Sequence, residues 1–508
     1  MFSKVKSFAL LGLEGILIDV EIDINKGLSS YDIVGLPDVA VKESKERVRS
    51  AIKNSGFTFP TNKITVNLAP ANVKKAGPMF DLPVAVAILS SSSQLISTKL
   101  KDFIVVGELG LDGKVKPVQG VLPILISAKN LGYTKFIVPK ANEKEASYIE
   151  GIDVYAFESL TDIVSFLAGH IEFGAVEQKT WIGENINKFH ENFSRVKGQR
   201  IAKRAIEIAV SGGHNILMVG PPGAGKTMIA RCIPGIMPDL TFDEALEITK
   251  IHSIAGTLDL TKGLVGLRPF RSPHHTASTV AITGGGRDAK PGEVSLASEG
   301  VLFLDELPEY QRSTLETMRQ PLEDGVITVS RASGSYEYPA NFMLVASMNP
   351  CPCGNYGSRE LECTCSPSAI QKYLKKISGP LLDRIDLKIN VDRVKFRELT
   401  EKADEESSEE IKKRVDEARK IQQKRFAGSS VRMNAKMTSK MINEYCKLDA
   451  ESESVMKLAF EKYHISARGY ARILKVARTI ADLEKSEDIK IEHLTEALAY
   501  RNIDKFQM

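Results

Sequence analysis

The sequence predicts a multidomain α/β protein in which an α+β domain, an α/β domain and a helical domain follow one another along 508 residues. Three observations support this fold class. Short strand and helix patterns alternate up to about residue 169, an apolar strand runs into a glycine-rich loop and a helix near residue 220, and the residues beyond about 394 have helical patterns only. The predicted division is therefore 1–169, a linker at 170–192, a core at 193–394 and a helical domain at 395–508.

The individual elements are predicted from apolar periodicity and from turn residues. In the first domain we expect a strand pair over 8–20 that turns at Glu14 and Gly15, helices over 42–55, 82–95 and 122–131, and strands over 64–68, 103–109 and 136–139. In the core we expect strands over 215–219, 301–304 and 342–347 and a hairpin over 326–338, followed by a charged helix over 398–426 and short helices over 439–501. The linker holds Trp181, the only tryptophan.

The composition is that of an ordinary water-soluble protein, with 43% hydrophobic and 26% charged residues. No apolar run approaches the roughly 18 residues needed to span a bilayer, and residues 1–13 lack the pattern of a signal peptide. Six cysteines in a chain of this length do not suggest a disulfide scaffold. We therefore expect a cytoplasmic protein without a membrane partner. The net charge of +4 is too small to indicate or exclude a nucleic-acid partner.

The glycine-rich loop has the pattern of a phosphate-binding loop. Its glycines let the backbone turn its N–H groups inward toward phosphate oxygens, and the following helix adds its positive N-terminal end. Lys226 is expected to reach the β- and γ-phosphates, and the Thr227 hydroxyl to bind Mg²⁺. The predicted nucleotide-binding set is Gly220, Pro221, Pro222, Gly223, Ala224, Gly225, Lys226, Thr227 and Met228.

A second string completes the prediction of nucleoside triphosphate hydrolysis. The apolar strand over 301–304 ends in Asp305 and Glu306. Asp305 is expected to hold Mg²⁺ through water and Glu306 to polarise the attacking water, because phosphoryl transfer depends mainly on positioning and charge neutralisation. An ordinary glycine-rich turn is the alternative for the loop alone. The strand, the helix and the two carboxylates together favour an ATPase that uses ATP and Mg²⁺.

Strings spread over the whole chain resemble the ComM/YifB family of magnesium-chelatase-like AAA+ ATPases. They read DIVGLP at 32–37, VNLAPA at 66–71, RPFRSPHH at 268–275, MNPCPCG at 348–354 and RILKVARTIADL at 472–483. The segment 291–306 also resembles the minichromosome-maintenance DNA helicases. This second likeness favours nucleic acid over a porphyrin as the substrate.

The family resemblance implies further catalytic residues. Asn349 corresponds to sensor 1, which orients the attacking water, and Arg384 to an arginine finger that acts on the ATP of a neighbouring subunit. Such a finger contributes roughly 10³- to 10⁵-fold to turnover. Arg468, with Arg472 as the second choice, corresponds to sensor 2. The resemblance therefore implies a ring of identical subunits, with a hexamer as the expected assembly.

Residues 106–118 are similar to a stretch of the proteolytic domain of Lon. Cleavage by that enzyme requires a serine nucleophile activated by a lysine. At the corresponding places this chain has Met79, which follows a Gly-Pro pair, and Val121, Leu122 and Pro123. We therefore expect a Lon-like α+β fold without protease activity, and ring assembly or DNA guidance are the alternatives for its role.

Four of the six cysteines, Cys351, Cys353, Cys363 and Cys365, lie within one short segment. Thiolates in a set of four suit tetrahedral Zn²⁺, although the Cys-x-Cys spacing is a weaker signal than paired Cys-x-x-Cys motifs. A redox-sensitive pair and ordinary reduced cysteines are the alternatives. Cys232 and Cys446 are expected to be buried apolar side chains.

Two segments are candidates for DNA contact. Arg271, His274 and His275 lie between the phosphate-binding loop and the strand that ends in Asp305, and Arg331 lies near the turn of the expected hairpin. Hairpins in related ring motors hold nucleic acid through phosphate contacts that are independent of sequence. Solvated loops are the alternative, and adjacent histidines rarely converge on one metal ion.

The leading functional hypothesis is a hexameric ATP-driven motor that moves along DNA. The family resemblance implies branch migration of recombination intermediates during natural transformation. Two alternatives are an ATPase subunit that assists the insertion of Mg²⁺ into a porphyrin, and a regulatory scaffold whose nucleotide state controls a partner protein. The Lon-like segment and the cysteines argue against the first alternative, and the intact Glu306 argues against the second.

Overall fold

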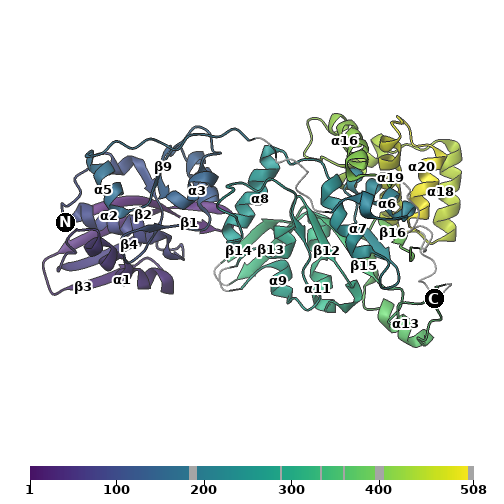
Figure 1. The fold of residues 1–508 in the computed structure, drawn as a ribbon, viewed down its shortest axis with the longest axis horizontal. Helices are drawn as coiled ribbons and strands as arrows, with labels where there is room; N and C mark the ends of the chain where they lie inside the picture. Colours follow the sequence, from purple (N-terminus) through teal and green to yellow (C-terminus); the bar gives the residue numbers. More distant parts are fainter. Residues whose placement is uncertain are drawn as a thin grey trace. The chain divides into compact units, whose positions relative to one another are not determined.

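The computed structural model describes residues 1–181, 183, 191–286, 289–331, 334–358, 361–394 and 405–501. The chain forms two compact units (Figure 1). Unit 1 comprises residues 1–183, 241–266 and 328–338, and unit 2 comprises residues 184–240, 267–327 and 339–508. Two segments that interrupt the ATPase-like region of the sequence therefore belong to the unit built by the N-terminal residues.

Unit 1 is built on a seven-stranded mixed sheet with the order β3-β4-β2-β1-β5-β8-β9. Its strands are β1 (Phe2–Leu11), β2 (Glu14–Asn25), β3 (Ser30–Val34), β4 (Lys63–Ala69), β5 (Phe103–Val105), β8 (Lys135–Pro139) and β9 (Asp153–Phe157). The pairs β1–β2 and β2–β4 are antiparallel, and the other neighbours are parallel. Along β2, Ile18, Val20 and Ile22 are buried and alternate with acidic residues, as expected for a sheet with one face in the core.

The predicted turn at Glu14 and Gly15 is wrong, because the β1–β2 hairpin turns at residues 12 and 13, and Leu11 pairs with Glu14. Gly12 has a φ of 62°, which is the conformation that such a turn requires. Gly15 is needed for a different reason. A Cβ on Gly15 would lie 2.9 Å from the Cβ of Ser127, whose hydroxyl accepts a hydrogen bond from the Gly15 N–H at 2.8 Å.

The helices of unit 1 are α1 (Val39–Asn54), α2 (Asp81–Ser91), α3 (Val121–Asn130), α4 (Glu143–Ala146) and α5 (Leu160–Ala168). Helix α1 begins earlier than predicted because the Asp38 side chain accepts the Val41 N–H and caps it. The expected strand over 103–109 is divided into β5 and β6 (Glu108–Leu109), and β6 pairs with β7 (Val115–Lys116) instead of joining the large sheet. Strands β3 and β9 and helix α5 were not predicted.

Helix α8 (Phe242–Ala255) is the part of the inserted segment that packs into unit 1. Its Ser253 hydroxyl accepts the Gly120 N–H at 3.0 Å and donates to the Glu145 carboxylate at 3.2 Å. Burial raises the pKa of Glu145 to about 7. At the other end of α8, the Phe242 ring lies 6.4 Å from the ring of Trp181, measured between centroids. The segment is thus held by buried polar contacts and by aromatic packing.

Unit 2 contains a five-stranded parallel sheet with the order β11-β12-β15-β10-β16. The strands are β10 (Ile216–Val219), β11 (Phe270–Arg271), β12 (Val301–Leu304), β15 (Met343–Met348) and β16 (Leu387–Asn390). Every residue of β10, β12 and β15 is buried, which is typical of a parallel sheet covered on both faces. The hairpin expected over 326–338 is formed by β13 (Val326–Arg331) and β14 (Gly334–Pro339), and most of it belongs to unit 1.

Helices pack beside this sheet, and all of them except α6 come from the C-terminal part of the chain (Figure 1). They include α6 (Arg200–Gly212), α16 (Ser408–Arg425), α17 (Ser439–Tyr445), α18 (Ala450–Lys462), α19 (Ala467–Leu483) and α20 (Ile491–Ala499). Part of the charged helix predicted over 398–426 lies outside the described residues, and α16 begins with a capping box formed by Ser407 and Glu410. In the part of the chain that the structure describes, no helix has the length and apolar character needed to cross a membrane.

Candidate functional site

The carboxyl ends of three neighbouring strands, β12, β15 and β10, bring the two predicted ATPase strings together. Paired residues Leu304 and Ala346, and Val219 and Met348, place the strand ends at one edge of the sheet. A cavity of about 360 Å³ opens there. Its lining consists of Pro222, Gly223, Ala224, Gly225, Lys226, Thr227, Met228, Asp305, Glu306, Ser347, Met348 and Asn349.

The phosphate-binding loop connects β10 to α7 (Lys226–Cys232). Gly223 and Gly225 have φ values of 78° and 86°, so the loop uses a left-handed backbone at two positions. Gly220 is constrained by packing, because a Cβ there would lie 2.1 Å from the Val391 carbonyl oxygen. Helix α7 begins at Lys226, and its N-terminal end faces the loop.

Lys226 is held inside the loop by three acceptors. Its Nζ donates to the Gly220 carbonyl at 2.6 Å, the Pro221 carbonyl at 3.0 Å and the Asn349 Oδ1 at 3.1 Å. Burial lowers the pKa of Lys226, while Asp305 and Glu306 act in the opposite direction. The amine is therefore oriented before a phosphate arrives, and the structure places Asn349, the predicted sensor, directly beside it.

A compact set of oxygen atoms lies next to the lysine. The Thr227 hydroxyl donates to Asp305 Oδ2 at 2.8 Å, and the Ser347 hydroxyl donates to Asp305 Oδ1. Hydroxyl and carboxylate oxygens are the hard ligands that Mg²⁺ prefers. Ser347 was not singled out in the sequence, although a hydroxyl in an otherwise apolar strand was a usable signal.

Glu306 follows Asp305 with a φ of 52°, an uncommon conformation for a residue other than glycine. Its Oε2 lies 3.5 Å from Nδ1 of His275, and the His274 and His275 rings are 4.1 Å apart between centroids. The loop that carries the two histidines is fixed by Tyr310, whose hydroxyl donates to the Pro273 carbonyl at 2.6 Å. A residue predicted to contact DNA thus lies beside the predicted catalytic carboxylate.

The other DNA-contact candidates lie elsewhere. Arg271 makes a bidentate ion pair with Glu293, the first residue of α10 (Glu293–Leu296), at 2.6 and 2.7 Å. His274 contacts the Thr276 hydroxyl at 2.8 Å. Arg331 ends strand β13, and its side chain lies outside the described part of the structure. DNA contact by these four residues stays a prediction.

The arginines assigned to the finger and to sensor 2 converge on one carboxylate away from the cavity lining. Arg384 forms an ion pair with Glu323, and Arg468 lies 3.6 Å from the same side chain. Arg468 is 70% exposed, whereas Arg472 pairs with buried Asp386 at 2.6 Å. Burial opposes the charged form of Asp386, but Arg472 and His214 hold its pKa below the usual range. Arg472 therefore connects α19 to the start of β16. Of the two candidates for sensor 2, Arg468 is the more accessible to a nucleotide.

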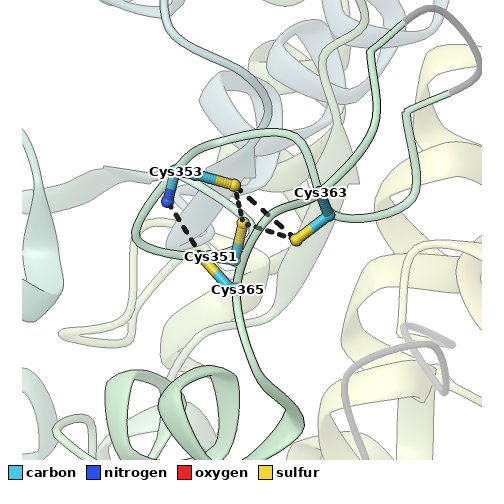
Figure 2. Close-up of side chains that lie close together, drawn as sticks. All are labelled: Cys351, Cys353, Cys363 and Cys365. Carbon is cyan, nitrogen blue, oxygen red and sulfur yellow. Dashed lines mark hydrogen bonds between the residues drawn. The ribbon is translucent and has the colours of Figure 1, made fainter.

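The four clustered cysteines approach one another closely in the loop between β15 and α13 (Pro367–Leu374), as Figure 2 shows. Residues 359 and 360 of this loop lie outside the described part. The other two cysteines, Cys232 and Cys446, are buried as predicted, and burial raises the pKa of each thiol to about 12. In unit 1, Met79 is 8% exposed in a turn of 3₁₀ helix, and Pro123 lies in the first turn of α3.

The chain is similar to several known proteins over most of its length. The family model "Magnesium chelatase, subunit ChlI" matches residues 192–399, and models for other parts of that subunit match residues 20–142 and 405–501. Competence protein ComM of Haemophilus influenzae is 42% identical over 98% of this chain and 97% of its own length. The uncharacterized protein YifB of Escherichia coli is 43% identical over 99% of this chain and 97% of its own length. A Lon protease of Lachnoclostridium phytofermentans is 25% identical over 32% of this chain and 21% of its own length.

Proposed function

The chain belongs to the ComM/YifB magnesium-chelatase-like family, and on this premise we propose that it is an ATP-hydrolysing ring motor that acts on DNA. The family relationship indicates an ATPase that uses ATP and Mg²⁺. The observation that carries the proposal is the cavity at the sheet edge, where Lys226, Thr227, Asp305, Glu306 and Asn349 meet.

The proposed reaction is attack of water on the γ-phosphorus of ATP. Backbone N–H groups of the loop and the Lys226 amine bind the phosphates, and the Asn349 contact at 3.1 Å keeps the amine in place. Thr227 and Asp305 would hold Mg²⁺, which neutralises charge on the phosphates. Glu306 accepts the proton of the attacking water, and His275 at 3.5 Å orients the carboxylate.

Ring assembly is proposed because two of the assigned arginines do not line the cavity of their own chain. Arg384 and Arg468 lie together on Glu323, so a neighbouring subunit that displaces Glu323 would receive both charges at its own γ-phosphate. A site completed in this way requires a head-to-tail contact between subunits, and a closed ring of six is the proposed assembly. The division into domains at 1–169, 193–394 and 395–508 belongs to the same proposal.

The DNA substrate is proposed from the family. The relative from Haemophilus influenzae is named a competence protein. We therefore propose branch migration during natural transformation as the role, with a cytoplasmic location. The N-terminal region is proposed to have a Lon-like fold without protease activity. Hydrolysis itself needs only ATP and Mg²⁺, and zinc at the four cysteines would have a structural role.

The magnesium-chelatase alternative has specific support in the three family models. The magnesium-chelatase subunit of Euglena gracilis is 24% identical over 43% of this chain and 66% of its own length, whereas the competence protein aligns over 97% of its own length. The full-length relatives therefore favour the DNA motor. The regulatory scaffold is disfavoured because Glu306 lines the cavity beside Lys226 and Asp305, where a water-polarising carboxylate is needed only for hydrolysis.

The test is ATP turnover by the purified wild-type protein and Glu306→Gln, each with no DNA, single-stranded DNA, duplex DNA and a four-way junction. We expect DNA to stimulate the wild type several-fold, and Glu306→Gln to bind ATP without hydrolysing it. Turnover that ignores every DNA would exclude the motor and direct attention to a protein or porphyrin target. Absence of turnover in the wild type under all conditions would exclude the ATPase as well.

A further inference from the structure

We propose that Cys351, Cys353, Cys363 and Cys365 bind one zinc ion through four thiolates, and that this ion braces the phosphate-binding loop. The metal site is argued from the cysteines alone. Its effect on nucleotide binding rests on the proposed function of the neighbouring loop.

The sulfur positions fit one tetrahedral ion. The four Sγ atoms all lie within 4.8 Å of one another. Cys351 and Cys353 are 3.3 Å apart, and the Sγ of Cys363 lies 3.7 Å from the first and 3.6 Å from the second. Four Zn–S bonds of about 2.3 Å in a tetrahedron place the sulfurs roughly 3.8 Å apart. The spacing is therefore close to that of a ligand set, and all six cysteines are free thiols.

Backbone N–H groups point at two of the four sulfurs. The Cys353 N–H points at the Sγ of Cys365 at 3.4 Å, and the Tyr356 N–H points at the Sγ of Cys351 at 3.3 Å (Figure 2 draws the first contact). N–H donors of this kind orient thiolate ligands and reduce the repulsion between them. Metal binding would release the thiol protons to solvent without any change of oxidation state.

The chain geometry explains how two Cys-x-Cys pairs can converge despite their tight spacing. Gly354 and Gly357 have φ values of 82° and 77°, and they reverse the chain between the pairs. The first pair follows the end of β15, and the second pair precedes the start of α13, so both are anchored by regular structure. Cys351 is fully buried, and its thiol therefore faces the other three from inside the fold.

The same loop touches the nucleotide site at two places. A Cβ on Gly354 would lie 2.4 Å from Cδ of Pro222, so the cysteine loop packs directly against the phosphate-binding loop. Two residues before Cys351, the Asn349 Oδ1 accepts the hydrogen bond from Lys226 at 3.1 Å. A zinc ion that fixes the cysteine loop would therefore keep Gly354 packed on Pro222 and Asn349 hydrogen-bonded to Lys226. Loss of the ion would weaken both contacts.

The first measurement is the zinc content of untagged full-length protein purified without chelators, together with X-ray absorption at the zinc edge. We expect about one zinc per chain with four sulfur neighbours at about 2.3 Å. Four results would overturn the site: iron in place of zinc, less than about one tenth of an equivalent of zinc per chain, oxygen or nitrogen atoms as neighbours of the zinc, or a disulfide within the cluster found by mass spectrometry. These measurements on the wild type decide the question even if variants fail to fold.

The second measurement compares Cys363→Ser/Cys365→Ser with Cys446→Ala, which removes a buried thiol outside the cluster. The double variant is expected to lose its zinc and to bind a fluorescent ATP analogue at least threefold more weakly, and the control to keep both properties. Retained zinc in the double variant would overturn the site. Lost zinc with unchanged nucleotide binding would overturn the bracing. Zinc in a wild type that hydrolyses no ATP would leave the site standing and remove the proposed function.

Discussion

Replacing the buried carboxylate Glu145 by glutamine should change how the stability of unit 1 depends on pH. Glu145 accepts hydrogen bonds from Asn142 at 2.6 Å and from Ser253 of α8 at 3.2 Å. Burial raises its pKa from 4.5 to about 7, because desolvation disfavours the charged carboxylate by more than the hydrogen bonds from Asn142 and Ser253 stabilise it. The native state therefore keeps a proton that the unfolded chain loses as the pH rises between these two values.

The sign follows from proton binding. Where the native state binds more protons than the unfolded state, the free energy of unfolding falls as the pH rises. The contribution of Glu145 is thus fully present below its unfolded pKa and is lost as the pH rises through its folded pKa. A shift from 4.5 to about 7 corresponds to a loss of roughly 3 kcal/mol across the interval. Glu145→Gln cannot ionise and should not lose this amount.

Trp181 provides the assay, because it is the only tryptophan and lies against α8. Its ring is 6.4 Å from Phe242 and 6.4 Å from Tyr148, so its emission reports on the packing of α8 within unit 1. Urea titrations of the wild type and Glu145→Gln at about pH 5 and about pH 8 give the difference between the two proteins at each pH. We expect this difference to move by roughly 3 kcal/mol in favour of the variant at the higher pH. Equal pH dependence in both proteins would refute the reasoning.

Three further predictions concern the nucleotide site. Asn349→Asp places a carboxylate where an amide oxygen now lies 3.1 Å from the Lys226 amine, and it should weaken ATP binding at least tenfold. Asn349→Ala should change the affinity less and should lower kcat. A titration with a fluorescent nucleotide that finds equal affinities for the two variants would contradict this prediction. His275→Ala removes the imidazole 3.5 Å from Glu306 and should lower kcat about tenfold (~1.4 kcal/mol) while the affinity for ATP stays unchanged. Steady-state kinetics that show an unchanged kcat and a weakened affinity would exclude a positioning role for His275. Arg384→Ala should lower turnover roughly 10³-fold. If the active sites are shared between subunits, mixing Arg384→Ala chains with Glu306→Gln chains should restore part of the activity. No recovery in the mixture would argue for an active site within one chain.

The parts of the site that the sequence predicted are those fixed by local chain geometry. The phosphate-binding loop depends on glycines at positions where a strand meets a helix, so the pattern alone places Lys226 and Thr227. Asp305 could be predicted because it directly follows a buried strand. Parallel strands end at one edge, and this rule brings the two strings together without any knowledge of the strand order.

The parts that were missed depend on contacts between distant residues. A glycine such as Gly15 is typical of a turn in sequence. In the structure, however, a glycine is needed at this position because Ser127, more than a hundred residues away, packs against it. His275 was predicted to contact DNA because its segment lies between the phosphate-binding loop and the strand that ends in Asp305, and only the fold shows that Glu306 is 3.5 Å away. The convergence of the cysteine pairs likewise depends on chain reversal at Gly354, which spacing alone does not reveal.

The return of residues 241–266 and 328–338 to unit 1 means that the two units cannot be cut apart at a single point. A truncated protein that starts after residue 183 would retain α8, whose Ile248 and Ile251 are buried in the full-length chain. Such a fragment would expose an apolar surface of α8 to solvent, and it is expected to aggregate. A domain exchange with this chain would therefore have to transfer all three segments of unit 1 together.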